Sequence, residues 1–79
     1  MSGEVPFEKA VENLFRTLRE KWEKAKDDKI DRAFFLINAV MLINELLDSY
    51  AKDEEERKRL VKRIDELWDE AGFPKNNGT

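Results

Sequence analysis

The chain has 79 residues, of which 41% are apolar and 42% charged, and its 15 basic and 18 acidic side chains give a net charge of −3. It contains no cysteine and no histidine, so disulfides, zinc sites built from these residues and the commonest general base are excluded. The acidic balance disfavours contact with a phosphate backbone, and we expect no nucleic-acid partner.

The first predicted helix covers residues 6–26. Its apolar side chains recur at steps of three and four residues, the spacing of one face of an α-helix. The main members of this face are Phe7, Val11, Leu14, Leu18, Trp22 and Ala25. Pro6 suits the first turn because that position needs no N–H donor. Asp27 and Asp28 predict the end of the helix, since Asp side chains bind free backbone N–H groups and favour cap positions.

The second predicted helix covers residues 29–52 and has more apolar surface than two neighbouring helices can cover. At about 100° per residue, its polar positions fall on one narrow strip, made of Asp31, Asn38, Glu45 and Ser49. Two neighbours in a bundle cover roughly half of a helix surface. The predicted core half consists of Leu36, Ala39, Val40, Ile43, Leu46, Leu47 and Tyr50, with Ala33 and Phe35 at its edges.

The apolar side chains left over beside the polar strip predict a partner-binding face. The predicted partner-binding residues are Ile30, Phe34, Ile37, Asn38, Met41, Asn44, Glu45 and Asp48. An apolar cluster with polar groups at its edge is typical of a protein-recognition patch, and Phe and Met are suitable anchors. The alternative is that core packing buries Ile37 and Met41, because an apolar circumference indicates burial without showing what covers it. Phe34 is the strongest candidate for exposure.

The third predicted helix covers residues 54–71 and has the clearest boundaries. Asp53 can cap its start, and Glu56 follows three residues later as in a capping box. Gly72 predicts a left-handed C-terminal cap, after which Phe73 is expected to pack against Trp68. The apolar face of this helix consists of Leu60, Val61, Ile64, Leu67, Trp68 and Ala71.

These elements predict an all-α fold, an antiparallel up-down-up three-helix bundle with short connections. We expect one domain over residues 6–74, an N-terminal tail at residues 1–5 and a disordered C-terminal tail at residues 75–79. A continuous rod through the second and third helices is disfavoured, because about two turns between Ala51 and Leu60 contain no apolar residue.

No group of residues equips the chain for catalysis, and we expect a protein that is not an enzyme. Its serines, Ser2 and Ser49, have no suitable base partner for activation. The aspartates at positions 27, 28 and 31 lack the glycine and the bidentate glutamate of a calcium-binding EF-hand loop, and we interpret them as helix caps. We expect no metal and no cofactor.

The N-terminal residues do not follow the pattern of a signal peptide, and we expect a cytoplasmic or recombinant protein. The longest apolar stretch, from Ala33 to Leu47, contains Asn38, Asn44 and Glu45 and is too short and too polar to span a bilayer. We expect no membrane association, and either a monomer or a weak homodimer.

The segment Asp53–Ala71, DEEERKRLVKRIDELWDEA, has a Glu-rich start, a middle rich in Lys and Arg, and no Gln, His or Cys. In these features, and in length and topology, the chain resembles computationally designed (de novo) three-helix-bundle mini-proteins. Such proteins are often made as binders that present one helix face to a target, and the resemblance implies a designed binder.

The function we expect is a non-enzymatic protein–protein interaction module that presents an apolar face of the middle helix to a protein partner. The alternative is a structural scaffold without an external partner, either designed or thermophile-like, because hyperthermophilic proteins share the enrichment in Lys and Glu. In that case self-association or internal packing would bury the surplus apolar face.

Overall fold

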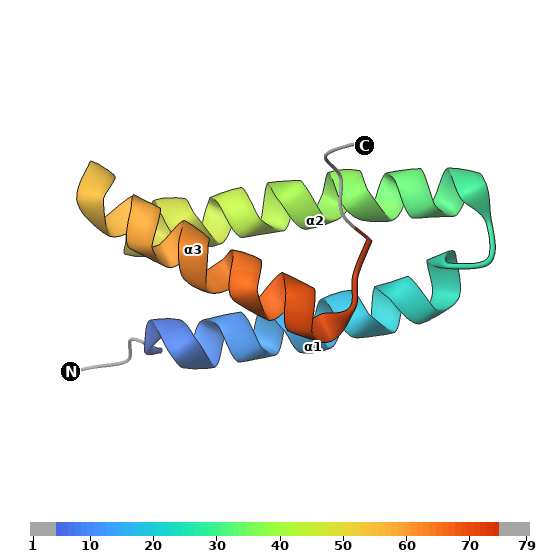
Figure 1. The fold of residues 1–79 in the computed structure, drawn as a ribbon, viewed down its shortest axis with the longest axis horizontal. Helices are drawn as coiled ribbons and strands as arrows, with labels where there is room; N and C mark the ends of the chain where they lie inside the picture. Colours follow the sequence, from blue (N-terminus) through green and yellow to red (C-terminus); the bar gives the residue numbers. More distant parts are fainter. Residues whose placement is uncertain (1–4, 75–79) are drawn as a thin grey trace. The chain divides into compact units, whose positions relative to one another are not determined.

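The computed structural model describes residues 5–74, and these form three α-helices: α1 Phe7–Ala25, α2 Lys29–Tyr50 and α3 Glu54–Ala71 (Figure 1). No strand occurs in this part of the chain. The predicted all-α, three-helix fold class is therefore confirmed, and each helix boundary lies within two residues of its predicted position. The predicted tail at residues 75–79 and the first four residues of the predicted N-terminal tail lie outside the described residues.

The chain divides into two compact units between Leu46 and Leu47, near the end of α2. The first unit contains α1 and most of α2, and the second contains the last turn of α2 together with α3. The expectation of one domain over residues 6–74 stays a prediction.

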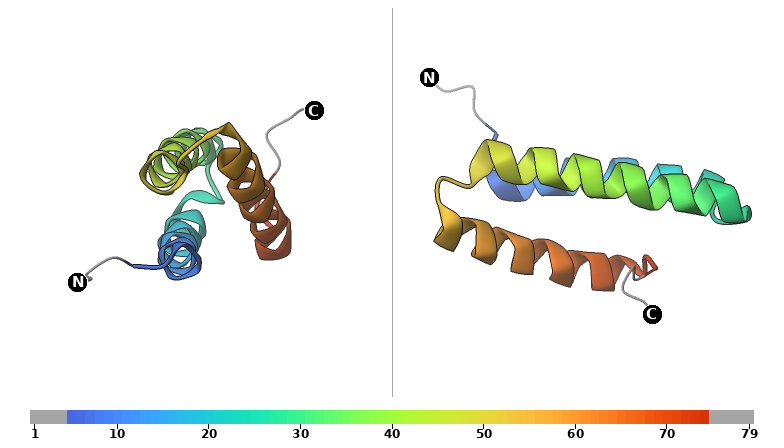
Figure 2. Two further views of the ribbon diagram at one scale, coloured as in Figure 1. Left: turned by 90° about the vertical axis from the view of Figure 1, so that its left-hand side faces the viewer. Right: turned by 90° about the horizontal axis from the view of Figure 1, so that it is seen from above.

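A short turn joins α1 to α2 in the first unit. The N–H of Asp28 donates to the carbonyl oxygen of Ala25 at 3.2 Å, which closes the turn after α1. The Oδ1 atom of Asp28 then accepts hydrogen bonds from the N–H groups of Ile30 at 2.8 Å and Asp31 at 3.1 Å. These bonds satisfy two backbone donors at the start of α2, which is the role of an N-cap, so the cap assignment of Asp28 is confirmed. The same interpretation is wrong for Asp31, which lies in the first turn of α2 and supplies one of the N–H groups that Asp28 caps. Because of this turn, α1 and α2 run antiparallel, side by side (Figures 1 and 2).

The core of the first unit is built from one face of each of its two helices. Its buried side chains are Val11, Phe15, Leu18 and Ala25 from α1, and Phe35 and Ala39 from α2. The rings of Trp22 and Phe35 lie 5.0 Å apart, centroid to centroid, and are tilted by 51°. Such aromatic pairs contribute about 0.5–1.5 kcal/mol beyond the area they bury. The pair therefore helps to fix which side of α2 faces α1.

The rotation of α2 about its axis differs from the predicted one. Val40, which we predicted in the core, is 47% exposed, whereas Phe35, predicted at the edge of the core, is only 3% exposed. Ala33, the other predicted edge residue, is exposed. Burying an aromatic ring removes more apolar area from water than burying a valine, and the ring of Trp22 offers Phe35 a specific partner. The buried strip is therefore turned toward Phe35 and away from Val40.

Reciprocal capping and an ion pair join the last turn of α2 to α3 in the second unit. Oδ1 of Asp53 accepts from the N–H of Glu56 at 2.8 Å, and Oε1 of Glu56 accepts from the N–H of Lys52 at 2.9 Å. The predicted cap is confirmed, although the Glu56 side chain reaches the residue before the cap residue. The guanidinium of Arg57 donates to Oδ1 of Asp48 at 2.9 Å. This ion pair links the last turn of α2 to the first turn of α3.

The apolar face of α3 is buried unevenly. Ile64 is 3% exposed, whereas Val61 lies at the edge of the face and is exposed. The other members, which are half-buried, are Leu60, Leu67, Trp68 and Ala71. The predicted face is confirmed except at Val61.

The end of α3 is held by a glycine cap and an aromatic pair. Gly72 has a φ of 77°, in the left-handed region that glycine adopts without steric cost, and its N–H donates to the carbonyl oxygen of Asp69 at 3.1 Å. The rings of Trp68 and Phe73 lie 4.8 Å apart in an edge-to-face arrangement. The indole N–H of Trp68 also donates to the carbonyl oxygen of Pro74 at 2.9 Å. The predicted cap and the predicted contact between Phe73 and Trp68 are both confirmed.

Candidate protein-binding face

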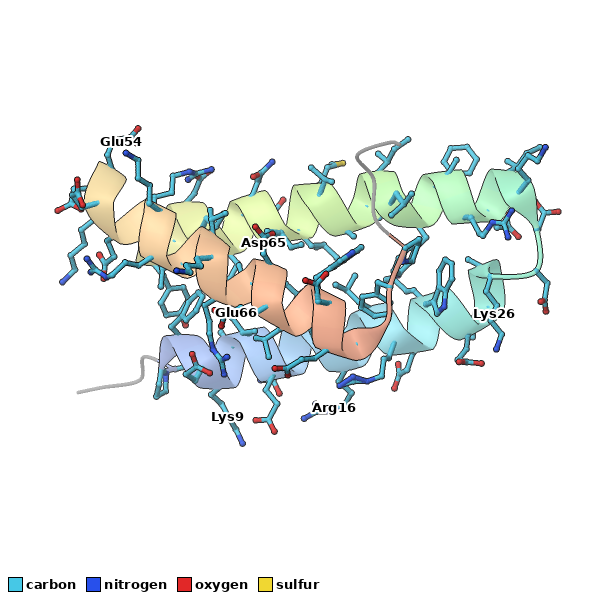
Figure 3. All side chains as sticks on the ribbon, viewed as in Figure 1. Lys9, Arg16, Lys26, Glu54, Asp65 and Glu66 are labelled. Carbon is cyan, nitrogen blue, oxygen red and sulfur yellow. The ribbon has the colours of Figure 1, made fainter. Side chains whose placement is uncertain are left out.

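Apolar side chains cover the side of α2 that points away from α1. Five of them are between 47% and 66% exposed: Ile30, Phe34, Ile37, Val40 and Met41. We call this set the outer face of α2. Figure 3 shows a row of mostly carbon side chains along this side of the helix. On α1, by contrast, the labelled side chains of Lys9 and Arg16 project away from α2 into solvent (Figure 3). The first unit therefore has one charged outer side and one apolar outer side.

The outer face has the spacing of a helix-packing seam. Its residues Ile30, Phe34, Ile37 and Met41 follow one another at steps of four, three and four, as the a and d positions of a heptad do. Val40 lies one helical turn after Ile37 and widens the face on one side. From first to last residue the seam spans three turns, a length of about 17 Å. Its dimensions suit contact with another helix or with a shallow groove.

The two edges of the outer face differ in chemistry. Asp31, Asn38 and Glu45 lie along one edge at seven-residue intervals, and all three are exposed. Because i±3 and i±4 positions are neighbours on a helix, this polar edge runs beside Phe34 and Met41. The opposite edge contains small or apolar side chains and one amide, those of Ala33, Val40 and Asn44. From position 33 onward, α2 contains no lysine or arginine.

The eight residues predicted to bind a partner are all exposed. The prediction that Phe34 is exposed is confirmed at 59%, and the alternative in which core packing buries Ile37 and Met41 is wrong, since both are 55% exposed. Exposure is what a binding residue requires, and the binding role itself stays a prediction.

Two residues change the composition of the predicted face. Asp48 is exposed but is held by Arg57 at 2.9 Å and belongs to the second unit, so its carboxylate is already engaged in the turn before α3. Val40 belongs to the outer face, although the sequence pattern predicts it in the core. Its position one turn from Ile37 is the sequence signal that could have placed it there, once the direction of the core is known.

Neither metal-binding nor membrane-spanning features occur in the part of the chain that the structure describes. Within residues 5–74, no group of three or more carboxylates is placed to hold a metal ion. Over the same residues, no helix combines the length and the apolar character needed to cross a bilayer. Comparisons of the chain with protein-family models, with curated proteins and with solved structures gave no match.

Proposed function

We propose that this chain is a non-enzymatic protein-interaction module, which docks the outer face of α2 on an apolar surface of a partner protein. The observation that carries the proposal is the continuous row of exposed apolar side chains from Ile30 to Met41 on a helix whose other side is buried. Contiguous apolar patches with polar edges are typical of protein interfaces. The resemblance to designed mini-proteins supports the same use, that of a designed binder.

The size of the outer face suits a modest but specific interaction. Fully burying a large apolar side chain contributes about 1.5–3 kcal/mol, and these side chains have roughly half of their area left to bury. The five together can thus contribute several kcal/mol, against an association cost of at least about 4 kcal/mol. Phe34 and Met41 are the expected anchors, because large side chains near the centre of a patch dominate binding.

A scaffold without an external partner is the competing function. Packing among residues 5–74 does not cover the outer face, because its members are exposed. Self-association is the remaining way to bury the face without another protein. Light scattering over a concentration series separates the two functions, since a self-associating scaffold gives a dimer that dissociates on dilution.

The proposal is tested with a photo-cross-linking amino acid in place of Phe34, and with the same group in place of Arg16 on α1 as a control. Proteins that are cross-linked to the chain through position 34, and not through position 16, are purified. Their affinities are then measured for the wild-type chain and for the double variant Phe34→Asp/Met41→Asp. We expect the double variant to bind at least about 100-fold more weakly, because both anchors are lost.

The matched control variant is Asn13→Asp/Thr17→Asp, which adds the same two negative charges to exposed positions of α1. It should bind like the wild type. Both double variants should keep the wild-type helicity. The control should lie within about 1 kcal/mol of the wild-type unfolding free energy, and Phe34→Asp/Met41→Asp should lower it by no more than about 2 kcal/mol, because each half-exposed side chain loses only part of its buried apolar area. The proposal is rejected if the captured proteins bind the Phe34→Asp/Met41→Asp variant as tightly as the wild type while that variant remains folded.

A further inference from the structure

The two unequal edges of the outer face limit what can cover it. The exposed carboxylates of Asp31 and Glu45 lie on one edge, with the amide of Asn38 between them. Within residues 5–74, neither carboxylate forms a salt bridge, in contrast to Asp48, which binds Arg57. A partner that covers the apolar seam therefore meets two available negative charges along one side only.

A second copy of the chain is a poor occupant of this face. In an antiparallel two-fold pair of helices, each edge lies against the same edge of the other copy, so the carboxylates of Asp31 and Glu45 from both chains would gather along one side of the pair. In a parallel pair, each acidic edge would lie against the opposite edge, where Val40 would help to desolvate a carboxylate. The antiparallel pair brings like charges together, and the parallel pair desolvates a carboxylate. A partner with positive charges along this edge avoids both penalties.

Resting on the proposed function, we infer that the partner surface is an amphipathic α-helix with lysine or arginine along one flank. Its apolar side chains fill the seam of Ile30, Phe34, Ile37 and Met41, whose heptad spacing matches that of a facing helix. Its basic flank lies against Asp31 and Glu45, where opposite charges fix the direction and register of the helix. The absence of basic residues on α2 after Arg32 means that nothing on this helix repels such a flank there.

The inference is tested with two synthetic amphipathic peptides of about three heptads, identical except that one flank carries lysine in the first and glutamate in the second. Binding of each peptide to the full chain is measured by fluorescence anisotropy at low and at high salt. We expect the lysine peptide to bind about five- to tenfold more tightly at low salt, with the difference reduced at high salt by screening.

Charge reversal locates the effect. The variant Asp31→Lys/Glu45→Lys should prefer the glutamate peptide, because its edge is now basic. The control variant Glu12→Lys/Glu20→Lys makes the same change in net charge at exposed positions of α1 and should keep the preference for the lysine peptide. An equal change of preference in both variants would show a general charge effect and would overturn the inference.

The remaining outcomes separate this inference from the proposed function. If both peptides bind equally and Phe34→Asp/Met41→Asp abolishes both interactions, the basic flank is rejected while docking on the outer face stands. If neither peptide binds, a helical partner is rejected, and the cross-linking experiment still decides the proposed function. A wild-type dimer that the same double variant disrupts would make a second copy the occupant and reject the basic helix.

Discussion

The rings of Trp22 and Phe35 lie 5.0 Å apart and join the end of α1 to the first half of α2. Phe35 is buried, whereas its neighbour Phe34, which projects about 100° away around the helix, is exposed. Two adjacent phenylalanines therefore have different roles: one holds the hairpin together, and the other belongs to the outer face of α2.

This difference predicts opposite effects for two alanine substitutions. Phe35→Ala should lower the free energy of unfolding by about 3–5 kcal/mol, because it removes a buried ring and leaves a cavity. Phe34→Ala should change it by less than about 0.5 kcal/mol, as expected at an exposed position. Urea denaturation followed by far-ultraviolet circular dichroism measures both. Equal losses would contradict the assignment of the two rings.

The corrected rotation of α2 is tested at Val40 and Ala39. Val40→Asp should cost about 1 kcal/mol, because a half-exposed side chain loses only part of its buried apolar area. Ala39 is 0% exposed, so Ala39→Asp buries a carboxylate and should cost more than about 4 kcal/mol or prevent folding. Thermal unfolding of the two variants side by side makes the comparison. A larger loss of stability for Val40→Asp than for Ala39→Asp would support the original prediction that Val40 lies in the core.

The cap at Asp28 should be worth about 1 kcal/mol. Asp28→Ala leaves the N–H groups of Ile30 and Asp31 without their side-chain acceptor, which is the usual cost of losing an N-cap. Asp27→Ala is the matched control, because it removes a carboxylate one residue before the cap position. Chemical denaturation should rank Asp28→Ala as the more destabilised variant, and the reverse order would show that Asp28 is not the cap.

Gly72→Ala should destabilise the protein by about 1–2 kcal/mol through its backbone conformation alone. Among the described residues other than Gly72 and its two neighbours in the chain, no atom lies within 4 Å of the position that a Cβ would take, so the cost comes from placing an L-residue at a φ of 77°. A chemically synthesised chain with D-alanine at this position is the control, since D-residues favour positive φ. If L- and D-alanine destabilise equally, the cost is not conformational.

One surface charge has a raised pKa. Nζ of Lys26 lies 2.9 Å from Oε1 of Glu23, and this hydrogen bond and charge raise the pKa of Lys26 above its ordinary value of 10.5. Because the folded-state pKa is the higher one, the pair stabilises the fold in full below the unfolded-state pKa and loses its effect as pH rises through the folded-state value. An NMR titration of Glu23→Gln should give a lower pKa for Lys26 than in the wild type. An unchanged pKa would rule out the pair in solution.

The parts of the fold that depend on neighbouring residues in the sequence could be predicted from it. The caps at Asp28, Asp53 and Gly72 each require a particular residue type within a few positions. Asp53 and Gly72 were predicted individually, whereas Asp28 was predicted together with Asp27 and Asp31. The contact of Phe73 with Trp68 is equally local, because it follows from the geometry of the glycine cap.

The rotation of α2 could not be predicted in the same way. It depends on Trp22, a residue thirteen positions before Phe35, and counting side chains around one helix gives no weight to a ring on another. That is why Val40 was placed in the core and Phe35 at its edge. The surplus of apolar residues nevertheless predicted an exposed side of α2. Ile30, Phe34, Ile37 and Met41 are exposed as the binding-face prediction requires, and the alternative that buries Ile37 and Met41 is wrong.

The outer face of α2 has all its side chains on one uninterrupted helix. A surface of this kind needs no loop to become ordered when it meets a partner, so the entropy lost on association comes mainly from side-chain rotamers and rigid-body motion. Phenylalanine, isoleucine and valine have few rotatable bonds, which leaves Met41 as the most adaptable member. Substitutions at this one position should therefore tune the range of partners accepted, while the stiffer side chains keep the shape of the surface constant.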